Sequence, residues 1–179
     1  MLYAFGFGRI GVVVCDLYFV DPDPTPGQEG AERGVRLEVR MLDRGALHGS
    51  IYSAQPIAVD RPIWRADLLE SVAGPPGSFD RTHHHPRFDG WEPGSRVFVE
   101  ALSADPLGWL GARLTDLYTI LAEAGVAAVE VAPADAADLR AAVPEIVEAT
   151  ASLLRRVHAG ELARPAHDQP LDNARAGWL

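Results

Sequence analysis

Three consecutive histidines, His83, His84 and His85, are the residues whose types and spacing point most directly to chemistry. In an extended segment, alternate side chains point to opposite faces, so His83 and His85 share one face and His84 takes the other. Two imidazoles on one face can both reach a single metal ion at about 2.0–2.1 Å. The run therefore predicts a metal site at His83 and His85.

Three carboxylates near the run could complete this site. Asp80, Asp89 and Glu92 lie within a few residues of the histidines and offer hard oxygen ligands. Two histidines and one carboxylate, with positions left open, suit zinc, ferrous iron or manganese. We therefore expect a divalent metal ion held by His83, His85 and one of these acids. The alternative interpretation is an exposed loop, because segments rich in Gly and Pro flank the run and histidines in such loops are often only solvated.

The spacing before the run resembles the first motif of the cupin family. Residues 77 to 85 read Gly-Ser-Phe-Asp-Arg-Thr-His-His-His, which fits a glycine, five residues and His-x-His. In that family, two histidines and a following glutamate bind a metal inside a β-barrel. The resemblance implies that His83 and His85 are ligands and that Asp89 or Glu92 is the acidic partner. It covers a short segment only, and the second cupin motif, Pro-x-Gly-x-x-His, is absent from the chain.

Charged side chains alternate with apolar ones in two expected strands, at 34–41 and 63–69. The residues on these charged faces are Arg36, Glu38 and Arg40 in the first strand and Arg65 and Asp67 in the second. If the strands are neighbours, their faces line a cleft continuous with His83 and Trp91. Because arginine forks match carboxylates and phosphates, we predict that Arg65, Arg81 and Trp91 bind a small anionic molecule. Cross-strand ion pairs on a solvated face are the alternative interpretation.

A glycine motif near the start, Gly6-Phe-Gly-Arg-Ile-Gly11, matches G-x-G-x-x-G and resembles the amino terminus of glyceraldehyde-3-phosphate dehydrogenases. Dinucleotide binding needs a helix that opens on the last glycine, because its N-terminus receives the pyrophosphate. Here residues 12–20 follow, and their β-branched and aromatic content is typical of a strand. We therefore expect a strand with a glycine bulge and no dinucleotide cofactor.

Composition excludes several classes of function. The 179 residues carry a formal net charge of −9, which argues against nucleic acids and anionic membranes as partners. All 16 basic residues are arginine, so Schiff-base chemistry on lysine is excluded. A single cysteine, Cys15, excludes an internal disulfide and a cysteine-cluster zinc site. The apolar start lacks a basic region and a cleavage site, so we expect a cytoplasmic location.

The apolar periodicity changes from two to about 3.6 along the chain. Strands are expected at 12–20, 34–41, 51–59, 63–69 and 96–100. A helix is expected from Asp105 to Gly125, then a short strand at 126–131 and a helical stretch over 139–157, kinked or divided at Pro144. Strands followed by helices predict an α+β fold. We expect a curved, mostly antiparallel sheet of five or six strands, with two C-terminal helices packed on one face. Residues 1–160 would form one domain and residues 161–179 a polar tail.

Together these patterns predict a small metal-binding protein or metal-dependent enzyme that acts on a small anionic substrate. The alternative belongs to another class: a non-catalytic ligand-binding or homodimeric assembly domain without metal. In that alternative, the helices or a sheet edge would make the dimer interface. Convergence of the His83 and His85 imidazoles with a carboxylate favours the first hypothesis, and their divergence into solvent favours the second.

Overall fold

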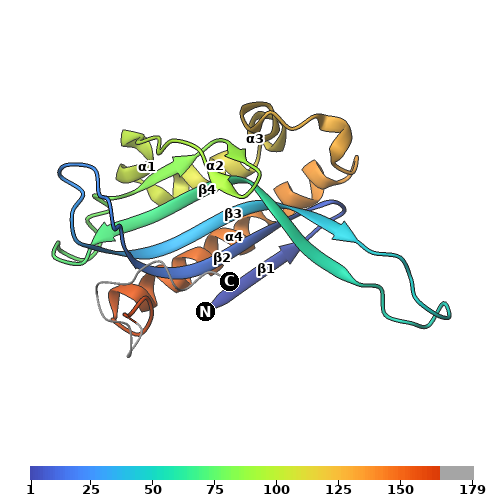
Figure 1. Cartoon of the computed structure of the whole chain (residues 1–179), viewed down its shortest axis with the longest axis horizontal. Helices are drawn as coiled ribbons and strands as arrows, with labels where there is room; N and C mark the ends of the chain where they lie inside the picture. The colour runs from blue at the N-terminus through green and yellow to red at the C-terminus, as the bar shows by residue number, and fades with distance from the viewer. Residues whose placement is uncertain (166–179) are drawn as a thin grey trace.

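Strand pairing follows chain order throughout the main sheet of the computed structural model, which describes residues 1–165. The order is β1-β2-β3-β4-β5, every pair is antiparallel, and the sheet is curved and not closed (Figure 1). The strands are β1 (Leu2–Gly6), β2 (Ile10–Val20), β3 (Ala31–Arg44), β4 (Ile57–Ser71) and β5 (His83–His85), with β6 (Phe88–Asp89) and β7 (Glu92–Pro93) in a separate hairpin. The predicted α+β class is therefore confirmed.

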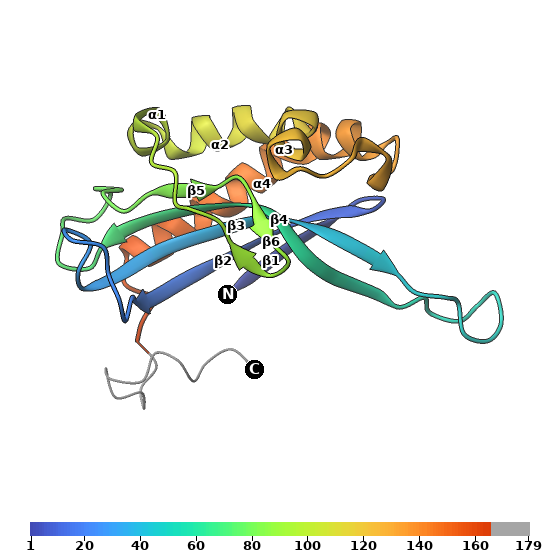
Figure 2. The same cartoon turned by 45° about the horizontal axis from the view of Figure 1, so that its top comes forward.

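Helices cover one face of this sheet (Figure 2). They are α1 (Glu100–Ala104), α2 (Pro106–Leu114), α3 (Leu117–Ala124) and α4 (Asp135–His158). Alternation along the strands directs fully buried side chains toward them, among which are Val12, Val14, Val35, Leu37, Val39, Trp64, Ala66 and Leu68. The opposite, open face carries Arg36, Glu38 and Arg40 of β3 and Arg65 and Asp67 of β4, because neighbouring residues on a strand point to opposite faces.

The longest helix, α4, is the helical stretch expected at 139–157, and it begins earlier, at Asp135. Leu139, Val143 and Ile146 recur at three- and four-residue spacing on its buried face. Pro144 lies inside the helix without dividing it. Over residues 1–165, no helix is both long enough and apolar enough to cross a membrane.

The single helix expected from Asp105 to Gly125 is two helices. Asp105 caps α2 as predicted, since its side chain accepts a hydrogen bond from Gly108 N at 3.0 Å. Asp116 ends the continuity, because its carboxylate accepts from the backbone N and the hydroxyl of Thr119, at 3.2 and 2.6 Å, and so begins α3. Gly125 then ends α3 in the left-handed conformation, with φ of 71°.

Two short strands expected from the sequence are absent from the described chain. Residues 126–131 contain a 3-10 helix, Ala128–Glu130, in which Val129 is 85 % exposed. Glu130 Oε1 accepts from Ala127 N at 3.1 Å, and this local bond replaces a strand ladder. Within 96–100, only Val97 bridges to β5, and α1 begins at Glu100.

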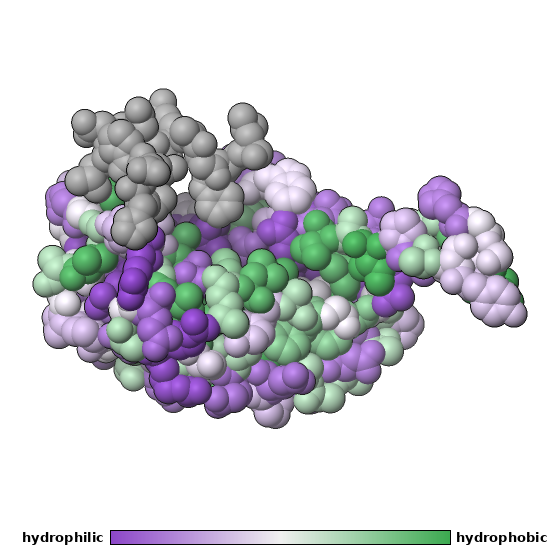
Figure 3. Space-filling view, turned by 90° about the horizontal axis from the view of Figure 1, so that it is seen from below, coloured by the Kyte–Doolittle hydropathy of each residue, from purple (hydrophilic) through white to green (hydrophobic). Residues whose placement is uncertain are grey.

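Strand β4 contains the whole of the segment expected at 63–69 and the end of the one expected at 51–59, while residues 51–53 lie in a turn. Pro62 lies inside β4 opposite Arg40, and the β3–β4 register shifts on both sides of Arg40. Beyond this irregularity the two strands leave the body as an arm, residues 42–59, whose tip holds the 91 % exposed Tyr52. Figure 3 shows the arm standing clear of the body.

The glycine motif forms the turn between β1 and β2 and not a bulge within one strand. Gly8 N donates to Asp135 Oδ1 at 2.6 Å, and Arg9 N donates to both oxygens of the same carboxylate. A Cβ on Gly8 would lie 2.6 Å from the Ala132 Cβ, so only glycine fits there. The backbone amides of this turn therefore bind a carboxylate of the protein itself, at the start of α4.

Candidate metal centre

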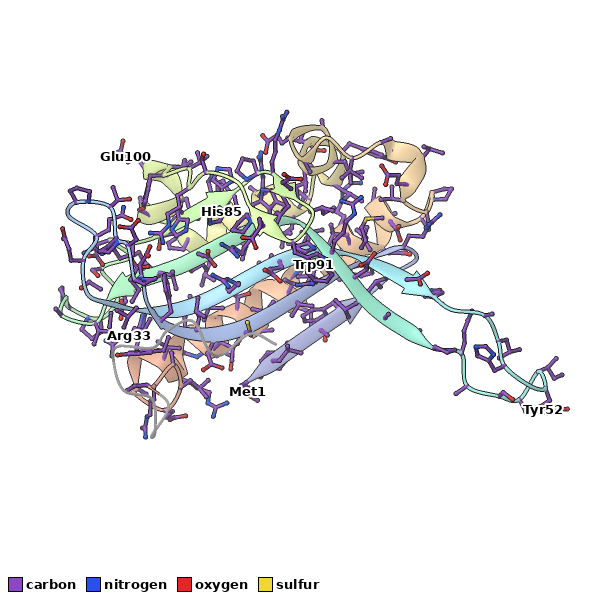
Figure 4. The ribbon with its side chains drawn as sticks, viewed as in Figure 1. Met1, Arg33, Tyr52, His85, Trp91 and Glu100 are labelled. Carbon is purple, nitrogen blue, oxygen red and sulfur yellow. The ribbon has the colours of Figure 1, made fainter. Side chains whose placement is uncertain are left out.

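Strand pairing brings Asp67 on β4 together with His83 and His85 on β5. Asp67 lies opposite His83 in the register, and Arg65 lies opposite His85. Because paired residues and alternate residues share a face, all four side chains lie on the open face of the sheet. Figure 4 shows His85 at this edge of the sheet. The two histidines expected to share a face therefore do so, in a short buried strand and not in an exposed loop.

The orientation of both imidazoles is set by backbone carbonyls. His83 Nδ1 lies 2.8 Å from Arg81 O, and His85 Nδ1 lies 2.7 Å from Gly94 O. A carbonyl can only accept, so each Nδ1 carries the hydrogen, and in the neutral rings each Nε2 presents a lone pair. The two Nε2 atoms lie 3.1 Å apart and face each other. This pattern of Nδ1 held by an outer acceptor is typical of metal-binding histidines.

The third corner is Asp67 Oδ2, which lies 3.4 Å from His83 Nε2 and 3.6 Å from His85 Nε2. Ligands about 2.05 Å from one ion are separated by about 2.9 Å at octahedral angles and about 3.4 Å at tetrahedral angles. The observed triangle fits these separations to within a few tenths of an ångström. The Asp67, His83 and His85 side chains are only 1, 2 and 4 % exposed.

Two arginines flank the carboxylate. Arg36 donates from Nε to Asp67 Oδ1 at 2.7 Å and from Nη2 to Oδ2 at 3.3 Å. Arg65 Nε lies 3.0 Å from Oδ2, and its Nη2 lies 3.0 Å from His85 Nε2, to which it can donate. Burial alone would raise the pKa of Asp67, but the positive charges of Arg36 and Arg65 outweigh it and hold this pKa well below its usual range. The carboxylate is thus ionised at neutral pH.

The environment also favours neutral imidazoles. Burial lowers the pKa of His85, and the contact with Asp67 only partly opposes this. His84 lies on the helix-facing side, with its ring centroid 6.0 Å from that of Trp64 and 5.3 Å from that of Trp109. Its burial lowers its pKa to about 4. A neutral imidazole is the form that coordinates a metal ion.

Aromatic rings flank the centre. The Phe98 ring centroid lies 5.4 Å from that of His83, and the Phe88 centroid lies 6.5 Å from that of His85. The Arg65 guanidinium lies over Phe88, at 5.6 Å from the ring centroid. Such apolar neighbours lower the local dielectric and strengthen electrostatic interactions inside the site.

The three acids proposed from the sequence lie outside this group. Asp80 accepts from Ser71 N at 2.9 Å and from Ser78 Oγ at 2.8 Å, in the turn before β5. Asp89 and Glu92 are exposed and face each other across the β6–β7 hairpin. Asp67 supplies the carboxylate instead, because antiparallel pairing places β4 beside the histidines. The sequence marked Asp67 only as the neighbour of Arg65 on a charged face.

The predicted ligand-binding residues are also separated. Arg65 contacts the metal group, whereas Arg81 donates to Gly27 O and lies 3.6 Å from the Asp80 carboxylate. Trp91 is 61 % exposed, with the Arg40 guanidinium 5.1 Å from its ring centroid. Strands β3 and β4 are neighbours, and cross-strand ion pairs such as Arg36–Asp67 line their shared face.

Comparison with known proteins identifies no relative of this chain. No family model matches the chain, and searches of curated proteins and of solved structures find no match. The open five-stranded sheet also lacks the closed barrel that the cupin resemblance implied, so that likeness is limited to the spacing of His83 and His85. Inferences about function therefore rest on the geometry of the site.

Proposed function

We propose that the chain binds a divalent transition-metal ion at Asp67, His83 and His85, and that this centre acts on a small anionic ligand. The observation that carries the proposal is the direction of the lone pairs. Both Nδ1 hydrogens are donated to backbone carbonyls, so two Nε2 lone pairs and a carboxylate oxygen converge on one point. The Arg65 guanidinium offsets the repulsion among these three electron-rich atoms from one side, and a metal ion at their centre would offset it fully.

Two histidines and one carboxylate leave further coordination positions free. This ligand set suits zinc, ferrous iron or manganese, and a metal bound in this way supplies a Lewis acid and a more acidic bound water. Asp67 and the two imidazoles would hold the ion, and the carbonyls of Arg81 and Gly94 fix the orientation of the imidazoles.

Charge balance supports an anionic ligand. Arg36 and Arg65 are matched by Asp67 and by Glu38, whose carboxylate lies 3.9 Å from Arg65 Nη1. Arg40 Nη1 also lies 2.5 Å from Glu38 Oε2, so these five groups carry one excess positive charge, to which a divalent ion would add two. An ion on His85 Nε2 would also replace the contact from Arg65 Nη2 and leave that donor free for an anion. We therefore place the anion beside Arg65.

Zinc titration tests the metal site. The tag-free chain is treated with EDTA, dialysed and titrated with zinc by calorimetry. We expect one zinc ion per chain. The His83→Ala/His85→Ala double variant should bind zinc more than about 100-fold more weakly, which is a larger loss than removal of a supporting hydrogen bond causes. His48→Ala, which removes an exposed histidine of the arm, is the matched control. Equal zinc binding by the double variant and the control contradicts the proposal, provided that circular dichroism shows both folded.

The role of Arg65 has a separate test. Arg65→Met removes a positive charge and the donor to His85 Nε2 but keeps an apolar stem of similar length. Zinc should bind this variant more tightly than the parent, because the ion no longer competes with a guanidinium. Inorganic phosphate should raise the zinc affinity of the parent more than that of the variant. Weaker zinc binding by the variant contradicts the placement of Arg65.

The homodimeric assembly domain stays the second candidate. The feature that favours it is the arm, which exposes Ile51, Tyr52 and Ile57 by 83, 91 and 58 %. Exposed apolar side chains on a projecting hairpin are typical of contact with another chain. Sedimentation velocity at high protein concentration tests this candidate, and a strict monomer contradicts it.

A further inference from the structure

A cleft of about 470 Å³ lies where β5 and the segment after it meet α2 and α3. Its lining residues are His84, Pro86, Arg87, Val97, Val99, Trp109, Arg113 and Glu123. Because His84 alternates with His83 and His85, this cleft is on the opposite side of β5 from the metal group. Its volume falls in the range of sites that hold small organic molecules.

Two lining side chains have buried polar atoms without partners. His84 is 6 % exposed, and its Nδ1 has no hydrogen-bond partner within residues 1–165. Arg113 Nε is likewise without a partner in the described chain. Nearly all buried polar atoms in native proteins are hydrogen-bonded, to protein, water or ligand. Both atoms lie just behind the surface of side chains that line this cleft, so a small rotation of either side chain would offer its nitrogen to a bound molecule.

The Trp109 indole gives the cleft a flat aromatic surface. The Trp109 ring stacks on Trp64 at 6.1 Å with an interplanar angle of 21°, and its centroid is 5.3 Å from that of His84. The Arg113 guanidinium lies over the same Trp109 ring, at 5.7 Å. A planar, unsaturated molecule can pack against such surfaces by offset stacking. The shape therefore favours a flat ligand over a branched one.

The charge of the lining residues indicates the charge of the ligand. Arg113 Nη2 donates to the Glu123 carboxylate, and Arg87 Nε donates to the Glu123 backbone carbonyl at 2.6 Å. Two guanidinium groups and one carboxylate leave a single excess positive charge, in a chain whose net charge is −9. One negative charge on the ligand balances this excess, and a carboxylate also offers acceptors for Arg113.

We propose that this cleft is a binding site for a small, flat organic monoanion, with the carboxylate beside Arg113 and the ring against Trp109. The His84 imidazole is part of the lining. The site is separate from the metal centre, so it needs no metal ion to bind its ligand.

The probe is benzoate, compared with its neutral isostere benzamide, and EDTA is present throughout. Binding is followed by the fluorescence of the tryptophans that line or adjoin the cleft. We expect saturable quenching by benzoate, with at least tenfold weaker binding of benzamide. Absence of saturable benzoate binding, or equal affinity for both probes, overturns the proposal. Because zinc is excluded, failure here leaves the zinc titration unaffected, and failure of that titration leaves this result unaffected.

Two charge variants test the location of the carboxylate. Arg113→Gln should weaken benzoate binding at least tenfold, and Arg87→Gln, at an exposed position that is safe for folding, should weaken it to a smaller extent. The matched control is Arg155→Gln, since the Arg155 side chain is 64 % exposed on α4. His84→Phe keeps a ring in place and should also weaken binding. Unchanged benzoate affinity in both charge variants overturns the assignment.

Discussion

The Asp67 carboxylate is the group whose removal should affect the protein most. Asp67→Asn keeps the volume and one acceptor oxygen but removes the negative charge that both Arg36 and Arg65 contact. Asp67 is 1 % exposed, and the arginine side chains are 18 and 11 % exposed. Loss of one partner of a buried ion pair destabilises a protein by about 3–5 kcal/mol, because the other charge stays buried without compensation. Since both arginines reach some solvent, we expect the lower end, about 3 kcal/mol.

Thermal unfolding in EDTA measures this loss without a metal contribution. In a chain of this size, 1 kcal/mol shifts the unfolding midpoint by about 2–4 °C, so we expect a fall of about 6–12 °C. The matched control is Asp80→Asn, because that carboxylate also accepts two hydrogen bonds, from a backbone amide and a hydroxyl, but in an exposed turn. It should cost less than about 1 kcal/mol. If both variants unfold at the same temperature, the buried charge cluster is not the source of stability that we infer.

Two further outcomes follow from the contacts and pKa shifts described above. The pKa of His84 is about 4 in the folded chain against 6.5 unfolded, so the unfolded chain takes up the proton first and stability falls as the pH drops from 6.5 to 4. Urea denaturation in EDTA should show that the free energy of unfolding falls by at most about 3 kcal/mol over this range because of His84. The His84→Phe variant should show a smaller fall, and the same pH profile in variant and parent contradicts the lowered pKa of His84. Asp135→Ala removes the acceptor for Ala132 N and for Gly8 N, which is 2.6 Å away. We expect it to lower the free energy of unfolding in urea by about 2 kcal/mol. Asp138→Ala, at an exposed position in the same helical turn, should lower it far less. Equal losses at the two acids would mean that interaction with the helix dipole alone explains the effect.

Local sequence signals predicted the elements that depend only on neighbouring residues. Alternation identified β3 and the second half of β4 and placed His83 and His85 on one face, and β-branched and aromatic content identified β2. Three- and four-residue spacing identified α4, and Asp105 marked the start of α2. These signals are reliable because backbone geometry alone sets which neighbours share a face.

Local signals competed at two places where the prediction from the sequence was wrong, the single helix from Asp105 to Gly125 and the strand at 126–131. Asp116 looked like an ordinary residue within a helix, yet its carboxylate bonds to Thr119 end α2 and begin α3. The apolar run at 126–131 suggested a strand, but no strand within residues 1–165 pairs with it, and Val126 and Val131 are buried on either side of a 3-10 helix. Propensity can favour either outcome in such short runs, and packing against the rest of the chain decides between them.

By itself the sequence determined the pair of histidines, the charged strand faces and the α+β class, because each follows from the residue types and the period of a single segment. Only the tertiary structure decided which carboxylate joins the pair. The β4–β5 register sets Asp67 opposite His83. Asp80 lies in the turn before β5, and Asp89 and Glu92 lie in the β6–β7 hairpin, so all three are outside the group although they are nearer in sequence to the run. A strand register depends on hydrogen bonds between distant segments and on the burial of a shared face. The acid that completes the centre therefore becomes evident only once the sheet has formed.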